Sequence, residues 1–231
     1  MTSGGESAPT DRGALTPDDA RSSRLYPRAS FEFERMAFFC DAVYAIALTL
    51  LVTSLDVPDI IHETSASDLW SALGDVRGRI ITFFVSFLVI GSFWLGHHRF
   101  FSHLRAVSRP LMYATLIYLA FVAFLPFPAS VLGAYDDNPV GVAFYAVSLA
   151  ILSGLEGVTF WLAWRQDLLT QRLSGAAFRW SMLATLTPVA MFLISIPIAF
   201  VNPTLGIVTW FVTFPIEAVL ERFRPPELAT E

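Results

Sequence analysis

The sequence contains no lysine and only one cysteine, Cys40. A single cysteine can form neither an internal disulfide nor a multi-cysteine metal site. Only 15% of the residues are charged, whereas about a quarter are charged in a typical soluble domain. The four histidines are too few for a metal-dependent membrane hydroxylase. These shortages exclude a disulfide scaffold, and they argue against a soluble domain and a metal enzyme.

Short motifs that mark particular functions are also missing from the sequence. There is no phosphate-binding loop, no nucleophile elbow and no zinc-protease motif. No apolar run carries the ladder of arginines that marks a voltage sensor. The TVGYG filter of common potassium channels is absent as well. We therefore expect no enzyme, no cofactor and no nucleic-acid partner.

The sequence is rich instead in long apolar runs, with 55% hydrophobic residues and a mean hydropathy of +0.57. Most runs reach the length that a helix needs to cross a bilayer, roughly 20 residues. The six runs are Met36–Leu55, Ile80–Phe101, Leu111–Leu132, Val140–Trp164, Trp180–Phe200 and Thr204–Leu220. The last is the weakest, because Pro203 precedes it and Pro215 interrupts it. The pattern predicts an all-α integral membrane protein with six transmembrane helices per chain.

Arginine placement predicts the orientation of these spans, because cytoplasmic loops carry an excess of basic residues. All 15 basic residues are arginines, and thirteen fall on one side of the predicted bilayer. They are Arg12, Arg21, Arg24, Arg28, Arg35, Arg99, Arg105, Arg109, Arg165, Arg172, Arg179, Arg222 and Arg224, against Arg77 and Arg79 on the other side. We therefore expect both termini in the cytoplasm.

The polar segments divide the chain further. Residues 1–30 are rich in Ser, Gly, Pro and Asp, which predicts a disordered cytoplasmic tail. Residues 31–222 form the predicted transmembrane domain, and residues 223–231 form a second short cytoplasmic tail. The acidic segment between the first two spans is expected to contain a short helix from Ala66 to Leu73.

Few ionisable groups lie inside the apolar runs, where insertion of a charge costs about 2.5–3.5 kcal/mol. Asp41 lies in the first span, His97 and His98 end the second, and Glu156 lies in the fourth. All four are near the predicted cytoplasmic level, as is Arg35, so they could meet. Such a cluster either holds helices together or takes part in moving ions or protons.

The first span has one face of particular composition. Ala42, Ile46, Thr49 and Thr53 follow one another at helical spacing and share that face. Bulky apolar and hydroxyl side chains alternate along it. Periodicity alone favours ordinary helix packing, because threonine hydroxyls can bond their own helix.

A longer motif surrounds that face. It consists of Arg35, three residues, Phe39-Cys40-Asp41 and then the run AIALTLL over residues 45–51. This motif resembles the signature of the transmembrane protein 175 family of potassium channels, which has serine where this chain has Cys40. Cysteine is a weaker hydrogen-bond partner than serine. The later run Phe93–His98 is also similar to the second helix of that family.

The resemblance implies a fold distinct from that of common potassium channels, in which four six-span chains form a homotetramer. The first helix would line the pore, with potassium ions as the permeant ligand and the lipid bilayer of a prokaryotic plasma membrane around it. It implies that Ile46 forms the constriction and that Thr49 belongs to a hydroxyl layer tied to selectivity. Ala42 and Thr53 would line the pore on the same face.

The resemblance also implies a structural network away from the pore, which would fix the angle of the first helix against the second. Its members would be Arg35, Phe39, Asp41, Trp94, His97 and His98. The sequence leaves open a channel for protons or mixed monovalent cations, and a secondary transporter. Against the transporter, there is no internal repeat with broken helices in matching positions.

Overall fold

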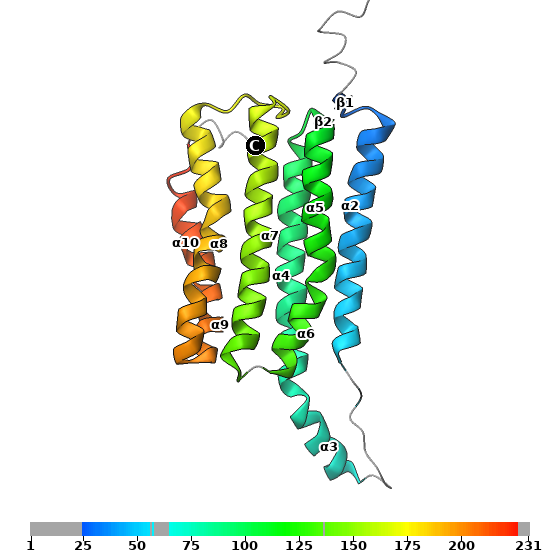
Figure 1. Cartoon of the computed structure of the whole chain (residues 1–231), viewed down its shortest axis with the longest axis vertical. Coiled ribbons are helices and arrows are strands. Elements are labelled where there is room, and N and C mark those ends of the chain that lie inside the picture. Colours follow the sequence, from blue (N-terminus) through cyan, green and yellow to red (C-terminus); the bar gives the residue numbers. More distant parts are fainter. Residues whose placement is uncertain (1–24, 56, 58–64, 136, 226–231) are drawn as a thin grey trace, which may run out of the picture.

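A computed structural model describes residues 25–55, 57, 65–135 and 137–225 of the chain. The elements in that part are β1 (Leu25–Pro27), α2 (Phe31–Leu50), the 3-10 helix η1 (Leu51–Ser54), α3 (Ala66–Asp75), α4 (Arg77–Ser102), β2 (Ala106–Ser108), α5 (Arg109–Phe124), α6 (Pro126–Ala134), α7 (Pro139–Arg165), α8 (Gly175–Val201), α9 (Pro203–Phe211) and α10 (Thr213–Glu221). The long helices run side by side, with α2 at one edge of the bundle and α8 to α10 at the other (Figure 1).

Six helical segments are long and apolar enough to cross a membrane, which confirms the predicted six-span plan. Three of these spans are single helices, namely α4, α7 and α8. The first span is α2 continued by η1, the third is α5 followed by α6, and the sixth is α9 followed by α10. The chain is therefore a mostly helical, multi-pass membrane protein.

Proline explains the breaks in the third and sixth spans. Proline has no N–H to donate and is tolerated in the first turn of a helix, where that N–H would be unpaired. Helix α6 begins with Pro126 and has Pro128 two residues later. In α10, Pro215 is the third residue after the break at Val212. Each new helix thus begins where its prolines fall in the first turn.

Polar side chains cap the starts of the spans. Ser30, Ser108 and Ser174 accept hydrogen bonds from backbone N–H groups in the first turns of α2, α5 and α8. Asn138 and Asn202 do the same for α7 and α9. Such caps satisfy N–H groups that have no partner inside the helix. The local sequence therefore determines where most spans begin.

Helix α7 is central to the bundle, because it packs against α5, α6, α8 and α9. Helix α2 packs on the other side of the bundle, against α5 and α4. Short α3 continues into α4 at one end of the bundle (Figure 1). The structure confirms the predicted helix in this segment. Ser65 caps it, and the Asp68 carboxylate accepts a hydrogen bond from the Ser65 backbone N–H.

The arginine-rich end of the bundle holds a small antiparallel sheet. In it β1 pairs with β2, with Tyr26 opposite Val107. The backbone N–H of Arg28 also donates to the carbonyl of Arg105 at 2.8 Å. The prediction of a disordered tail over residues 1–30 is therefore wrong for its last residues, because Leu25–Pro27 form a strand that pairs with β2. Residues 1–24 and 226–231 lie outside the described residues.

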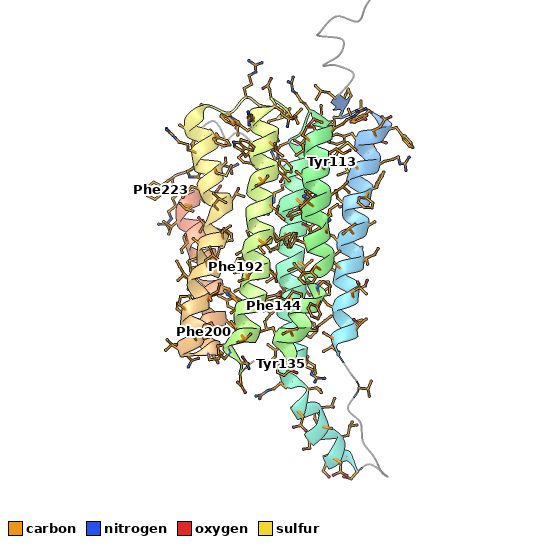
Figure 2. All side chains as sticks on the ribbon, in the orientation of Figure 1. Tyr113, Tyr135, Phe144, Phe192, Phe200 and Phe223 are labelled. Atoms are coloured by element: carbon orange, nitrogen blue, oxygen red, sulfur yellow. The ribbon has the colours of Figure 1, made fainter. Side chains whose placement is uncertain are left out.

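Aromatic side chains lie on the outer surface near both ends of the bundle. Figure 2 shows Tyr113 toward one end and Tyr135 at the other, and their exposed fractions are 68% and 62%. Phe200 and Phe223 are also exposed. Aromatic rings are enriched at both interfaces of a membrane. Their distribution therefore fits a bundle whose long axis crosses the bilayer.

Candidate functional site

One face of α2 and η1 is buried against the rest of the chain. Met36, Cys40, Tyr44, Ala47 and Leu51 lie on it, and none is more than 6% exposed. Their spacings of three and four residues define a single helical stripe. This stripe faces α4 and α5, the helices that contact α2 most extensively. The remaining surface of α2 is largely uncovered by the chain itself.

The four residues predicted to line the pore all lie on the uncovered surface. Ala42, Ile46, Thr49 and Thr53 are exposed, and Ile46 is 57% exposed. The Thr49 hydroxyl donates to the Ile46 carbonyl at 2.8 Å, and the Thr53 hydroxyl donates to the Leu50 carbonyl at 2.7 Å. Each hydroxyl therefore uses its only O–H donor in a hydrogen bond to a carbonyl of its own helix. Its oxygen can still accept a hydrogen bond or contact a cation.

A cluster of aromatic rings supports the buried side of α2. His97 is 3% exposed and stacks on the Tyr118 ring, with the ring centroids 5.2 Å apart. Its centroid lies 4.6 Å from that of Phe101 and 5.9 Å from that of Tyr44. The hydroxyls of Tyr44 and Tyr118 are hydrogen bonded to each other. His97 therefore packs within the protein and does not lie on the exposed face of α2.

Asp41 and Trp94 join α2 to α4 directly. The Trp94 indole Nε1 donates to Asp41 Oδ1 at 2.9 Å. The His98 ring lies beside Trp94, with centroids 5.7 Å apart, and the side chain is exposed. The structure thus brings Asp41, Trp94 and His98 together at one edge of the α2–α4 contact, and it places His97 in the aromatic cluster.

Arg35 and Phe39 lie outside the contact between α2 and α4. Arg35 is exposed, and its guanidinium lies over the Phe31 ring of its own helix, 5.5 Å from the ring centroid. Phe39 is 47% exposed. Neither side chain belongs to the buried stripe that packs on α4 and α5. Within one chain these two residues lie outside the buried contact with α4, and their place in the network stays a prediction.

Glu156 does not join Asp41 either, although both lie near one membrane level. The Glu156 carboxylate packs against α4 at Gly96, where an added Cβ would lie 2.9 Å from Oε1. Trp94, the partner of Asp41, is two residues away from Gly96 and so projects from the opposite side of α4. The expected meeting of Asp41 and Glu156 is wrong, because α4 stands between them.

The structure instead places Glu156 in a second polar site, which the sequence reasoning missed. This site is a cavity of about 700 Å³ that also contacts Arg99, Trp180, Thr213 and Glu217. Thr213 and Glu217 are four residues apart and share a face of α10. That four-residue spacing could have been read from the sequence as a shared polar face. The partners on α4, α7 and α8 could be found only from the packing.

The fold and the site together define a class. This is a six-span helical membrane protein whose first span keeps one face clear of the rest of the chain. Residues 35–126 match the family model described as endosomal/lysosomal potassium channel TMEM175. A potassium channel of Chamaesiphon minutus is 33% identical over 147 residues, which are 62% of this chain and 69% of the relative. The chain belongs to the TMEM175 family.

Other relatives agree with this assignment. A potassium channel of Streptomyces collinus is 38% identical over 124 residues, 53% of this chain and 59% of the relative. The endosomal/lysosomal proton channel TMEM175 of Bos taurus is 34% identical over 111 residues, 46% of this chain and 23% of that protein. The matches thus span little more than half of the Streptomyces relative and less than a quarter of the cattle protein.

The fold also has a counterpart among solved structures. It is similar to the crystal structure of a lysosomal potassium-selective channel TMEM175 homolog from Chamaesiphon minutus, with a TM-score of 0.67 and 25% sequence identity. The similarity covers 81% of this chain and 97% of that one. The likeness therefore extends over most of the chain.

Proposed function

We propose that four copies of this chain form a passive, potassium-favouring cation channel, with the exposed face of α2 around a central pore. One observation carries the proposal. Ala42, Ile46, Thr49 and Thr53 are all exposed, whereas the opposite side of the same helix is buried in its own chain. Helix α2 stands at an edge of the bundle, so this face can meet its counterparts in other copies (Figure 1).

Ile46 is the proposed constriction. Four copies of a bulky, apolar side chain around one axis would form a narrow neck that water leaves readily. Hydrophobic constrictions of this kind gate by dewetting. The 57% exposure of Ile46 in one chain leaves the side chain free to take part in such a ring.

Thr49 is the proposed polar layer beside that neck. Because its hydroxyl proton is donated to the Ile46 carbonyl, the hydroxyl oxygen presents lone pairs outward from the helix. Four such oxygens around an axis would replace part of the water shell of a cation. Thr53 has the same internal hydrogen bond one turn further along and would extend the polar lining.

The hydrogen bond between Trp94 and Asp41 has a supporting role in this proposal. It joins α2 to α4 at the side of α2, next to the exposed face. Any tilt of α2 changes the radius of a pore that α2 lines. We infer that this contact sets the angle of the pore helix without taking part in permeation.

The proposed setting is the plasma membrane of a prokaryotic cell, with both termini in the cytoplasm. Thirteen of the 15 arginines fall in sequence segments on the same side of the predicted spans as both termini, and two fall in the segment on the other side. The positive-inside rule then assigns the arginine-rich end to the cytoplasm.

Ion flux into liposomes that contain the purified protein tests the function. The proposal expects passive flux in both directions, larger under a potassium gradient than under an equal sodium gradient. The cattle relative is named a proton channel, so proton flux should be measured in the same liposomes with a pH-sensitive dye. Proton flux without potassium flux would favour that second function. Flux that requires a coupled counter-gradient would favour a secondary transporter.

A further inference from the structure

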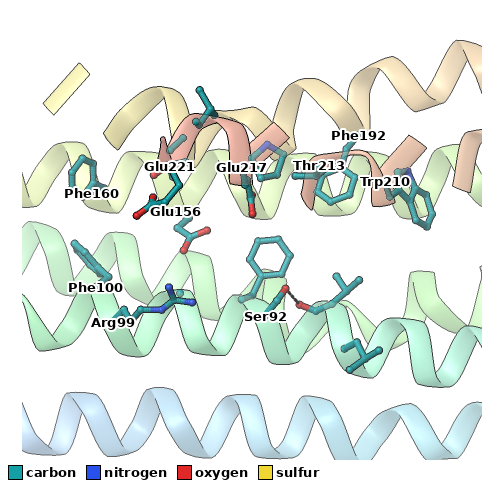
Figure 3. A pocket seen from close by; sticks show the side chains of 18 of the residues that line it. Ser92, Arg99, Phe100, Glu156, Phe160, Phe192, Trp210, Thr213, Glu217 and Glu221 are labelled. Carbon is teal, nitrogen blue, oxygen red and sulfur yellow. Dashed lines mark hydrogen bonds between the residues drawn. The ribbon is translucent and has the colours of Figure 1, made fainter. Parts of the chain in front are cut away.

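The cavity beside Glu156 lies on the far side of α4 from the contact with α2. Its walls come from α4, α7, α8, α9 and α10, and its volume is about 700 Å³. Val85, Leu88 and Phe192 line its apolar part. Figure 3 shows Arg99, Glu156 and Glu217 around the space between α4 and α10. The cavity therefore has an apolar part and a charged part, like an amphipathic ligand.

The charged part is acidic on balance. Glu156 from α7 and both Glu217 and Glu221 from α10 line it, against the guanidinium of Arg99. Glu156, Glu217 and Arg99 lie within electrostatic range of one another. Part of the Arg99 guanidinium is turned toward its own helix, because Nε donates to the Leu95 carbonyl at 3.3 Å. The Glu221 carboxylate is also paired with Arg224 at 2.8 Å, so Glu156 and Glu217 are left facing Arg99. Two carboxylates around one guanidinium leave a site that attracts a further positive charge.

Two buried polar atoms at this cavity have no partner in the part of the chain that the structure describes. They are the Oγ1 of Thr213 and the Nε1 of Trp180. Thr213 is only 8% exposed, so water outside the bundle does not readily satisfy it. A buried polar group without a partner destabilises the fold unless something supplies one. Both residues line the same cavity, and a ligand there would supply the partners.

We propose that this cavity binds an amphipathic amine, a molecule with a protonated amino group and a neighbouring oxygen on an apolar body. The ammonium group has three N–H donors, which suit the carboxylates of Glu156 and Glu217 and the hydroxyl oxygen of Thr213. Trp180 Nε1 can only donate, and it suits the ligand's oxygen. The apolar body lies against Val85, Leu88 and Phe192.

An organic cation fits this site better than a metal ion. Within the described ranges, no three His, Cys, Asp or Glu side chains are grouped closely enough to hold a metal. The apolar wall would also be unused by a bare ion. Two sources share the required chemistry, a free amphipathic amino alcohol and the ethanolamine headgroup of a phospholipid. The two are separated by the second experiment below.

Calorimetric titration of the detergent-purified protein tests the charge requirement, with 2-amino-1-octanol and its neutral counterpart 1,2-octanediol. The amine should bind at least about tenfold more tightly than the diol, because only the amine pairs with a carboxylate. Glu156→Gln should weaken amine binding about tenfold and leave diol binding unchanged. The matched control is Glu34→Gln, an exposed carboxylate on α2, which should bind the amine as the unmodified protein does.

Equal affinity for the amine and the diol would overturn the proposal. Unchanged amine binding in both Glu156→Gln and Glu217→Gln would overturn it as well. Glu217 is more exposed than Glu156, so Glu217→Gln remains informative if the Glu156 variant does not fold. Thr213→Val, which keeps the shape and removes the hydroxyl, should weaken amine binding several-fold. None of these measurements depends on ion flux.

Native mass spectrometry of protein from nanodiscs identifies the source of the amine. Nanodiscs with equal amounts of phosphatidylethanolamine and phosphatidylcholine are suitable, because the choline headgroup is charged but has no N–H donor. Retention of ethanolamine lipid that 2-amino-1-octanol displaces supports a lipid occupant. Binding of 2-amino-1-octanol without such displacement supports a free amine. Preferential retention of the choline lipid, with no amine binding, would contradict the proposal.

Discussion

The Trp94 indole donates a 2.9 Å hydrogen bond to the carboxylate of Asp41, and this bond links the second span to the first. It is placed between two surfaces of α2 with different roles. On one side of it lies the stripe that is buried in the chain, and on the other lies the exposed face that contains Ile46 and Thr49. Each surface can be tested separately.

The Trp94–Asp41 contact should matter for assembly more than for ion choice. Asp41→Asn removes the charge of the acceptor, and Trp94→Phe removes the donor. Each should lower stability by about 1 kcal/mol, and the double variant should lose less than the sum, since both changes break one bond. Thermal unfolding and size-exclusion chromatography in detergent provide the measurement. Intact oligomers with sharply altered selectivity would place Asp41 at the pore instead.

Removing one hydroxyl of the buried Tyr44–Tyr118 pair should destabilise the protein more than removing both. Tyr44→Phe leaves the hydroxyl of Tyr118 buried without its partner, which should cost about 1–3 kcal/mol. Adding Tyr118→Phe removes the orphaned hydroxyl and should recover much of that loss. Thermal unfolding of the two single variants and the double variant gives the comparison. A double variant less stable than either single one would mean that the hydroxyl pair is not the important feature.

Ile46→Asn should wet the proposed neck and raise conductance. A polar amide at the narrowest ring lowers the barrier to water and ions. Ile194→Asn is the control, because Ile194 is similarly exposed, at 52%, but lies on α8. Single-channel recording in planar bilayers should show a larger current for the first variant and an unchanged current for the second. Equal effects at both positions would contradict a pore on α2.

Thr49→Val should reduce the preference for potassium over sodium while the oligomer stays intact. The change keeps the shape of the side chain and removes one hydroxyl from each chain. Thr187→Val on α8 is the matched control, because its partly exposed hydroxyl also donates to its own helix, at Leu183. Reversal potentials under mixed potassium and sodium gradients provide the readout. An unchanged potential in the Thr49 variant would remove its hydroxyl from the selectivity mechanism.

The orientation of the bundle predicts where a cytoplasm-dependent reporter works. Fusion after Glu231 should give an active reporter, and insertion near Asp137 should give an inactive one. The reason is that most arginines fall in segments on the same side of the predicted spans as the C-terminus. Activity measured in intact cells decides between the two orientations. The reverse pattern would invert the topology and place the termini outside the cell.

The sequence by itself determined the properties that depend on neighbouring residues. The length and apolarity of the six runs predicted the spans, because a helix must bury about 20 residues to cross a bilayer. Helical spacing placed Ile46 and Thr49 on one face of the first span, and the structure leaves both exposed. Pro215 marked the weak point of the last span, although the break itself falls at Val212. Each of these features follows from local backbone geometry and hydrophobicity.

Only the tertiary structure decided which polar groups meet. Asp41 and Glu156 lie near one membrane level by sequence, yet α4 separates them because Trp94 and Gly96 project from opposite sides of that helix. The tertiary structure also paired Leu25–Pro27 with β2 and enclosed Thr213 in a cavity between distant helices. The positions of residues along each helix could be read from the sequence. The rotation of one helix against another depends on the combined packing of many side chains from different helices. No single segment of the sequence contains that information.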